Sequence, residues 1–216
     1  MSESRLPVAL DVAGRLVVVV GGGAVAERKA LNLLANGADL TVIAPELTAA
    51  LAKRAQAGTL RWVARAYQTG DLAGAWLAFA ATDAPTVNQQ VAADAAVSHI
   101  WCNVAAPPAA GSFHVLAAVR RDGVTVALGT EGASPFAARK LREGIESVVT
   151  PEVARLVGLL GEFRAEVQAR LADESQRRAC WEAMWQSEAS THLRNGDEHS
   201  ARELLASILD EAAKAS

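Results

Sequence analysis

The sequence predicts a doubly wound α/β domain over the first half of the chain, followed by an α-helical region. Up to about residue 112, short β-branched apolar runs alternate with helical stretches, which is typical of a parallel sheet with right-handed crossovers. A glycine-rich turn follows the first of these runs. From Pro151 onward no strand pattern remains, and apolar residues recur every three or four positions.

Five buried strands and three intervening helices are expected in the α/β domain. Residues 15–20 form a continuous apolar run that ends at glycines, which suits a strand buried on both faces. The strands are expected at residues 15–20, 40–44, 60–63, 76–81 and 100–104, and the helices at 24–35, 47–57 and 86–96. The first helix should end at Asn36-Gly37, because glycine readily adopts the left-handed conformation that closes a helix.

A different pattern begins after residue 112. Residues 113–121 fit either a helix or a strand, and residues 124–128 fit a strand beyond the Asp122-Gly123 turn. Ser134-Pro135 should open a helix, since serine accepts an amide hydrogen bond and proline fits the first turn.

The C-terminal region should form helices around one apolar stripe. Ser200 and Glu203 predict a capping box at the start of the last helix, and Trp181 and Trp185 are expected to pack inside this region. The predicted stripe consists of Val153, Leu156, Val157, Leu160, Phe163, Val167 and Leu171.

The composition favours a cytoplasmic globular protein. The formal net charge of −3 gives no overall attraction to nucleic acid or to anionic membranes. Met1 to Pro7 lacks the apolar core of a signal peptide, and the run Leu16 to Val20 is far too short to span a bilayer. Cys102 and Cys180 lie far apart and outside metal-binding spacings, so we expect reduced thiols and no resident metal.

The run from Gly21 to Ala26 has the GxGxxA pattern directly after a strand and at the start of a helix. Gly21 permits a tight turn, Gly23 lets a pyrophosphate approach the backbone, and Ala26 lets helix and strand pack closely. The helix N-terminus adds amide groups and a positive dipole end. The pattern predicts dinucleotide binding, and the alternative is a glycine turn, including Gly22, that serves only chain geometry.

The residues after the second strand favour NAD over NADP. Glu46 follows Pro45 close to where an acidic residue binds the ribose 2′-hydroxyl of NAD. Lys53 and Arg54 would favour a 2′-phosphate instead, but they lie one or two helical turns further along.

The carboxyl end of the fourth strand should face the same crevice. Thr82 and Asp83 stand there, where open α/β sheets bind their ligands. Asp83 fits the N-cap of the following helix equally well.

Four segments carry a resemblance to a known family. They read VVVVGGGAVAERKALNLLANGADLTVIAP, FAATDAPTVNQQV, CNVAAPPAAGSF and GASPFAARKLRE, and they precede a helical tail with RRACWEAMW. Together they resemble the N-terminal module of siroheme synthases, the precorrin-2 dehydrogenase and sirohydrochlorin ferrochelatase family. The resemblance covers nearly the whole chain, and because no room is left for the methyltransferase domain of some members, a stand-alone form is expected.

The resemblance implies a three-part homodimer. Residues 1–112 would form an NAD-binding Rossmann domain, residues 113–150 a central dimerisation and substrate region, and residues 151–216 a helical domain. NAD would oxidise precorrin-2 to sirohydrochlorin, and many members then insert ferrous iron at the same site. Carried over to this sequence, the cofactor contacts would be Ala24, Val25, Pro45 and Glu46.

One departure from the family affects catalysis. The family pattern Asn-Val-Val-Asp reads Asn103-Val104-Ala105-Ala106 here, so alanine replaces the aspartate favoured as general base. A positioned base contributes about 10²- to 10⁴-fold to a rate. Iron insertion, which removes two pyrrole protons, should suffer more than hydride transfer. Glu131 and His114 are candidate replacements, with a solvated loop carboxylate and a structural histidine as the plain alternatives.

A polycarboxylate tetrapyrrole needs a cationic, hydrogen-bonding pocket. The candidate substrate contacts are Asn103, Ser112, Thr130, Ser134 and Arg139. Arginine pairs with carboxylates through its planar fork, and a helix beginning at Ser134 would add a second anion site. The alternative for Arg139 is an ordinary solvated helix face.

Two other functions compete with the dehydrogenase. A tetrapyrrole- or NAD-binding carrier or sensor that has lost catalysis would explain Ala106. An unrelated small-molecule dehydrogenase would explain the first domain, but not the later matching segments.

Overall fold

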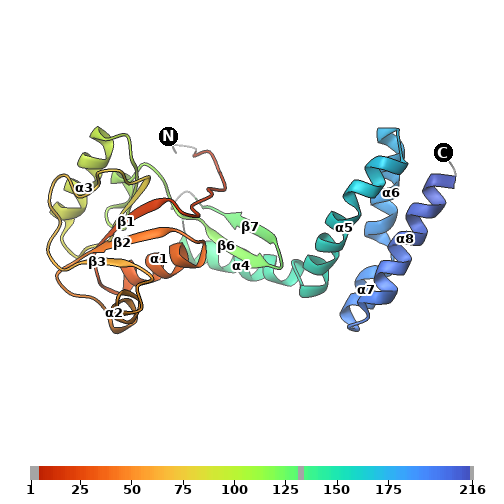
Figure 1. The fold of residues 1–216 in the computed structure, drawn as a ribbon, viewed down its shortest axis with the longest axis horizontal. Helices are drawn as coiled ribbons and strands as arrows, with labels where there is room; N and C mark the ends of the chain where they lie inside the picture. Colours follow the sequence, from red (N-terminus) through yellow and green to blue (C-terminus); the bar gives the residue numbers. More distant parts are fainter. Residues whose placement is uncertain (1–4, 131–133, 215–216) are drawn as a thin grey trace. The chain divides into compact units, whose positions relative to one another are not determined.

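The computed structural model describes residues 5–130 and 134–214 and divides into two compact units. The N-terminal unit covers residues 1–115 and the C-terminal unit residues 116–216 (Figure 1). The predicted division into residues 1–112, 113–150 and 151–216 stays a prediction.

The N-terminal unit is built on one parallel five-stranded sheet. Its order is β3-β2-β1-β4-β5, so the strand sequence changes direction between β1 and β4. The strands are β1 (Leu16–Val20), β2 (Asp39–Ile43), β3 (Arg61–Val63), β4 (Leu77–Ala80) and β5 (Trp101–Val104). The helices are α1 (Ala24–Ala35), α2 (Ala49–Gln56) and α3 (Pro85–Val97), and a 3₁₀ turn η1 (Pro108–Ala110) follows β5. The predicted doubly wound α/β class is confirmed.

Both faces of this sheet are buried, which explains the continuous apolar runs. Val17, Val19 and Phe79 pack on one face with residues of α1 and α2. Val18 and Val20 pack on the other face with residues of α3. Burial of one such valine stabilises the fold by about 1.5–3 kcal/mol.

The helix boundaries follow local capping chemistry. α1 ends at Ala35 with Asn36 as its C-cap, and Gly37 adopts a φ of +77°, as predicted. α2 begins two residues later than expected because Thr48 is its N-cap, and the Thr48 hydroxyl accepts a hydrogen bond from the amide of Leu51.

The C-terminal unit begins with a β-hairpin. β6 (Ala117–Arg121) pairs antiparallel with β7 (Val124–Leu128), which decides between the two predictions for residues 113–121 in favour of a strand. Asp122 and Gly123 both have positive φ, as the tight turn requires. α4 (Pro135–Val148) then starts as predicted, with the Ser134 hydroxyl accepting from the amide of Ala137.

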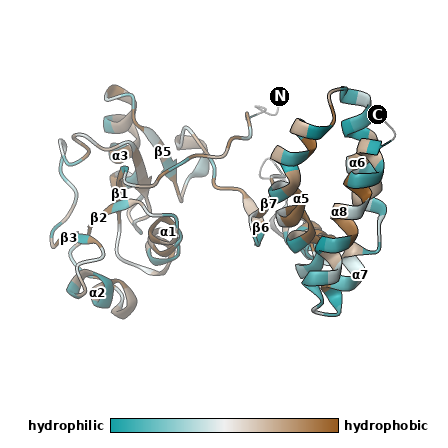
Figure 2. Ribbon diagram, turned by 45° about the vertical axis from the view of Figure 1, so that its right-hand side comes forward, coloured by the Kyte–Doolittle hydropathy of each residue, from teal (hydrophilic) through white to brown (hydrophobic). Residues whose placement is uncertain are grey.

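Four helices complete this unit: α5 (Pro151–Arg170), α6 (Glu174–Gln186), α7 (Ala189–Arg194) and α8 (Glu198–Lys214). Figure 2 shows hydrophilic and hydrophobic residues alternating along them. The predicted stripe on α5 is only partly right. Val157 is 40% exposed, whereas Leu159, which the stripe omitted, is fully buried. Because α5 packs against α6, α7 and α8, its buried face is wider than one stripe.

Two further predictions for the helical region are wrong. α8 begins at Glu198, and the Asp197 carboxylate accepts from the amide of Ser200 at 3.0 Å, so Ser200 and Glu203 form no capping box. A carboxylate three residues earlier caps the same turn. Trp181 packs against the helical core as expected, but Trp185 is 49% exposed.

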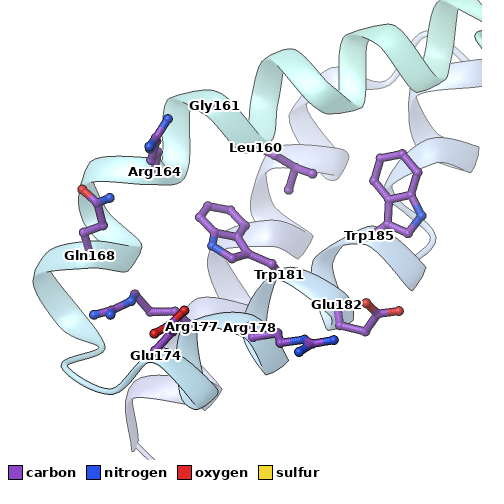
Figure 3. Close-up of a pocket in the computed structure, with 10 residues that line it drawn as sticks. All are labelled: Leu160, Gly161, Arg164, Gln168, Glu174, Arg177, Arg178, Trp181, Glu182 and Trp185. Carbon is purple, nitrogen blue, oxygen red and sulfur yellow. The ribbon is translucent and has the colours of Figure 1, made fainter.

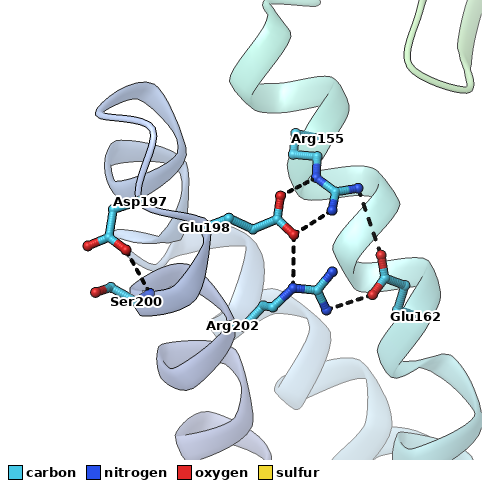
Figure 4. A network of polar contacts seen from close by, with 6 residues as sticks. All are labelled: Arg155, Glu162, Asp197, Glu198, Ser200 and Arg202. Atoms are coloured by element: carbon cyan, nitrogen blue, oxygen red, sulfur yellow. Dashed lines mark hydrogen bonds and ion pairs between the residues drawn. The ribbon is translucent and has the colours of Figure 1, made fainter.

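An ion-pair network joins α5 to α8 (Figure 4). Arg155 binds both carboxylate oxygens of Glu198, at 2.8 Å and 2.5 Å. Arg202 binds Glu198 at 2.9 Å and Glu162 at 2.6 Å. The two guanidinium groups lower the pKa of Glu198 to about 2.

Replacing Glu198 with glutamine should make the stability of the protein less sensitive to acid. Because the folded-state pKa of Glu198 is depressed, its contribution is present above the ordinary value of 4.5 and disappears as pH falls toward 2. Thermal unfolding should therefore give a lower Tm for Glu198→Gln than for wild type at pH 6 and a clearly smaller difference at pH 2.5, since the contribution is lost only as pH falls through the folded-state pKa. Glu203→Gln, on the same helix beside exposed His199, is the control and should match wild type. A Tm difference that is the same at both pH values would contradict the prediction.

Within residues 5–130 and 134–214, no helix has both the length and the apolar character needed to span a bilayer.

Candidate functional site

The glycine turn lies at the carboxyl end of β1, where the sheet order changes direction. Gly21 has a φ of +123°, and a Cβ there would lie 2.3 Å from the carbonyl oxygen of Ala81. A Cβ on Gly22 would lie 1.9 Å from the carbonyl oxygen of Glu46. Glycine is therefore required at both positions because neighbouring backbone atoms come too close for a side chain. For Gly21 and Gly22 this is the role in chain geometry that the sequence left as the alternative to dinucleotide binding.

Gly23 is different, because the chain itself does not require glycine there. A Cβ would meet no atom within 4 Å, and the φ of −83° suits any residue. Gly23 is the N-cap of α1, and no side chain caps the first turn of that helix. The space that a side chain would fill lies at a helix N-terminus, which fits a pyrophosphate. The residues present therefore fit a dinucleotide.

The loop after β2 is tied to the glycine turn. The amide of Thr48 donates to the carbonyl of Gly22 at 3.0 Å. This brings the backbone of Pro45 and Glu46 to the turn and leaves both side chains exposed. Lys53 and Arg54 are exposed on α2. The choice between the two nucleotides stays a prediction.

A buried asparagine that sequence reasoning missed holds the ends of β4 and β5 together. Asn88, on α3, is 1% exposed. Its side-chain oxygen accepts from the amide and the hydroxyl of Thr82, at 3.0 Å and 2.8 Å. Its side-chain amide donates to the carbonyls of Thr82 and Ala106, at 3.0 Å and 3.1 Å. Thr82 is thus held beside the loop that carries position 106.

Asp83 does not cap α3. The N-cap residue is Ala84, which has no side-chain cap. The amide of Ala84 instead approaches the Thr82 hydroxyl at 3.3 Å. The capping alternative for Asp83 is wrong, because the preceding threonine satisfies this turn.

Replacing Asn88 with alanine should destabilise the N-terminal unit by about 3 kcal/mol, since the part-buried backbone groups of Thr82 and Ala106 would lose their partners. Chemical denaturation followed by circular dichroism measures this loss. Gln90→Ala on the same helix is the control, because Gln90 makes only an exposed bond to Thr69. Equal midpoints for the two variants would rule out the structural role given to Asn88.

Asn103 belongs to a second polar contact, together with a lysine that the sequence did not single out. Lys29 Nζ donates to Asn103 Oδ1 at 2.6 Å, and the Asn103 amide donates to the carbonyl of Phe113 at 3.0 Å. Lys29 also lies 5.4 Å from the ring centroid of Phe79. Burial lowers the pKa of Lys29, and Arg28 lowers it further. The predicted substrate contact of Asn103 stays a prediction.

Ser112 closes the outer edge of β5. Its hydroxyl accepts from the amide of Cys102 at 2.8 Å, and its own amide donates to the carbonyl of Cys102 at 2.8 Å. The Ser112 hydroxyl therefore has a structural partner, and its contact with substrate stays a prediction. Burial raises the pKa of the Cys102 thiol to about 11, so the thiol stays protonated near neutral pH.

The candidate bases lie in different places. The side chain of Ala106 is exposed just beyond β5. His114 Nε2 lies 3.4 Å from the carbonyl oxygen of Pro108. Glu131 lies outside the described residues. The role of general base stays a prediction for His114 and Glu131.

The remaining predicted substrate residues belong to the C-terminal unit. The hydroxyl of Thr130 approaches the carbonyl of Ser134 at 3.5 Å, and Ser134 caps α4. The Arg139 guanidinium is exposed, 5.6 Å from the ring centroid of Phe136 and 3.9 Å from the Glu143 carboxylate. Over the residues that the structure describes, no three acidic, histidine or cysteine side chains cluster to hold a metal ion.

Comparisons with known proteins agree with this architecture. Residues 8–117 match the family described as "Putative NAD(P)-binding", and residues 152–209 match the sirohaem synthase dimerisation region. The chain is 40% identical over 208 residues to a siroheme synthase of Azotobacter vinelandii, covering 96% of this chain and 45% of that protein. It is 36% identical over 207 residues to a siroheme synthase of Photorhabdus laumondii, covering 96% and 44%. The chain thus spans less than half the length of these relatives.

A solved structure has the same fold. It is described as SirC, precorrin-2 dehydrogenase, and it aligns with a TM-score of 0.75 at 24% identity, covering 94% of this chain and 100% of that one.

The parallel sheet and its glycine turn define an NAD(P)-binding protein. With the dimerisation region that follows, the chain belongs to the family of siroheme synthase N-terminal modules.

Proposed function

We propose that this protein oxidises precorrin-2 to sirohydrochlorin with NAD. The observation that carries the proposal is the open position at Gly23, the N-cap of α1, which no atom of the chain occupies. A helix N-terminus after a glycine turn suits a diphosphate. The substrate is inferred from the siroheme synthases to which the chain is similar and from the solved precorrin-2 dehydrogenase that shares its fold.

The cofactor would be held along the carboxyl edge of the sheet. Ala24 and Val25 contribute backbone amides of the first turn of α1 toward the diphosphate. Pro45 and Glu46 lie at the ribose end, where the Glu46 carboxylate favours a free 2′-hydroxyl and therefore NAD. Thr82 and Asp83 follow β4 at the same carboxyl edge of the sheet. When bound, NAD supplies the hydride acceptor for the oxidation.

The oxidation removes one hydride and one proton from the macrocycle. Position 106, where the family resemblance places the base, holds alanine, which accepts no proton. His114 and Glu131 are the candidate acceptors in this chain, and bulk water is the slower alternative. We therefore confine the proposed activity to dehydrogenation, because iron insertion requires the loss of two pyrrole protons.

The C-terminal unit would contribute the contacts to substrate carboxylates. Arg139 on α4 offers an exposed guanidinium, and Thr130 and Ser134 stand at the start of that helix. The dimerisation region supports a homodimer as the working form.

The decisive experiment supplies purified protein with anaerobic precorrin-2 and NAD. We expect the sirohydrochlorin absorption spectrum and an equal amount of NADH, with a higher kcat/KM for NAD than for NADP. Ferrous iron added afterwards tests insertion separately. The absence of both products while NAD still binds would favour the second candidate, a non-catalytic carrier, which the alanine at position 106 supports.

A further inference from the structure

A half-buried lysine on α1 lacks a counter-ion within the part of the chain that the structure describes. Lys29 Nζ donates to Asn103 Oδ1 at 2.6 Å, and Asn103 is only 5% exposed. Burial lowers the pKa of Lys29, Arg28 lowers it further, and no carboxylate offsets them. A part-buried charge without an opposite partner is unfavourable for the fold. Packing alone therefore does not account for a lysine at this position.

The elements around Lys29 carry few acidic residues. α1 packs against β1, β2, β4 and α2. β1, β4 and β5 have no charged side chain, the charged residues of α2 are basic, and residues 105–115 include no acidic residue. The acidic residues in or directly after these elements are Glu27 in α1, Asp39 at the amino end of β2, Glu46 after β2 and Asp83 after β4. None of these four contributes to the pKa of Lys29, so none acts as its counter-ion.

The Lys29 side chain is directed toward the edge of the sheet that holds the glycine turn. Helical side chains lean toward the helix N-terminus, and α1 begins at that turn. The oxygen that Lys29 contacts belongs to Asn103, the last residue but one of β5. Val25 lies one helical turn nearer to the N-terminus on the same side of α1 and is 42% exposed. The chain therefore leaves this side of the helix open between Lys29 and the carboxyl edge.

Asn103 holds Lys29 in place and leaves it further donors. The side-chain amide of Asn103 donates to the carbonyl of Phe113 at 3.0 Å, so both polar atoms of that side chain have partners. An ammonium has more N–H donors than the single hydrogen bond to Asn103 uses. The remaining donors on Nζ are available to an anion.

The groove between α5 and α6 is another place where arginines gather (Figure 3). Its volume is about 770 Å³, and Arg164 and Arg178 line it. Glu174 and Glu182 line it as well, and all its lining residues lie within residues 152–209, which match the dimerisation region. Its mixed charge does not favour an anion.

We propose that Lys29 binds an anionic oxygen group of a ligand at the carboxyl edge of the sheet, and that Asn103 positions Lys29. The group is a carboxylate of the macrocycle or a phosphate of the dinucleotide, and both ligands rest on the proposed function. The anionic class follows from Lys29 itself. Hydrogen bonds from an ammonium to carboxylate or phosphate oxygens are strong, and the bound group would supply the missing counter-charge.

Two stable probes distinguish the sources of the anion. Uroporphyrin I, a porphyrin whose peripheral side chains all end in carboxylates, is titrated with full-length protein by fluorescence anisotropy, and NADH by its own fluorescence. Lys29→Met removes the charge and keeps an apolar stem beside Phe79. It should raise the Kd of at least one probe by about tenfold, because a hydrogen bond to a charged group is lost. A rise for uroporphyrin assigns a carboxylate, and a rise for NADH assigns a phosphate.

Asn103→Asp tests the same charge without changing Lys29. The new carboxylate has nearly the shape of the amide and would lie beside Nζ, so it would neutralise the ammonium from within the chain. The Kd of the same probe should rise about as much as in Lys29→Met. Because this variant keeps Lys29, the proposal is testable even if Lys29→Met fails to fold. Lys29→Arg, which keeps the charge, should retain most of the affinity.

Arg28→Met is the matched control. It removes one positive charge from the exposed neighbouring position on α1 and should bind both probes like wild type. Unchanged Kd values for both probes in Lys29→Met and Asn103→Asp, an equal rise in Arg28→Met, or no binding of either probe by wild type would overturn the proposal.

Turnover of precorrin-2 separates this inference from the proposed function. If wild type turns over precorrin-2 while the Lys29 and Asn103 variants bind both probes normally, only the role of Lys29 is wrong. If the variants lose affinity and wild type shows no turnover, Lys29 binds an anion and only the dehydrogenase is wrong.

Discussion

Gly23→Asp is expected to weaken NAD binding by about 100-fold, or ~2.7 kcal/mol, without destabilising the protein. The new side chain would enter the space at the N-terminus of α1, where a Cβ meets no atom of the chain. Its carboxylate would repel a diphosphate there. Aspartate is also a good N-cap, so α1 should be as stable as before. Titration with NADH, followed by fluorescence, measures the affinity.

Gly22→Ala is the matched comparison, and it should lower the stability of the protein, which Gly23→Asp should leave unchanged. Its Cβ would lie 1.9 Å from the carbonyl oxygen of Glu46, so the loop after β2 must move. We expect a loss of stability on the order of 3 kcal/mol, measured by chemical denaturation. If Gly23→Asp binds NADH as tightly as wild type, the nucleotide does not lie at this turn and the proposed function fails with it.

Ala106→Asp is expected to raise turnover of precorrin-2 by about 10²-fold, since a positioned base contributes about 10²- to 10⁴-fold. The side chain at position 106 is exposed, and only the carbonyl of this residue is engaged, by Asn88. A carboxylate therefore enters without displacing a buried group. Single-turnover kinetics with saturating NAD measure the chemical step.

Ala106→Asn has nearly the same shape as the aspartate variant but cannot accept the proton, so its rate should stay at the wild-type level. If both variants accelerate the reaction equally, the effect is one of shape or polarity and not of proton transfer. If neither does, while Glu131→Gln abolishes turnover, the base is at position 131.

Much of the N-terminal unit was predictable because its strands are buried on both faces. Runs such as LVVVV in β1 leave little choice of element, and the glycines beyond it identify the turn. The separate roles of the three glycines were not predictable. They depend on where Ala81 and Glu46 lie, and residue spacing contains no such distances.

The polar contacts that shape the site could not be predicted from the sequence either. Lys29 and Asn103 are 74 positions apart, and apolar periodicity reports only which face of an element is buried. Asn88 gave a weak signal, as an amide side chain near the start of a helix that follows a strand. In the helical region, Asp197 and Ser200 are both good N-caps, and only the observed start of α8 distinguishes them.

The hydrogen bonds between Ser112 and the main chain of Cys102 affect how the protein can associate with other chains. An edge strand with free amide and carbonyl groups can pair with a strand from another chain, which leads to domain swapping or fibril formation. Here the polypeptide turns back and occupies both main-chain groups of Cys102, so β5 is a poor template for a foreign strand. Extension of the sheet by a strand of a second copy is therefore disfavoured at Cys102.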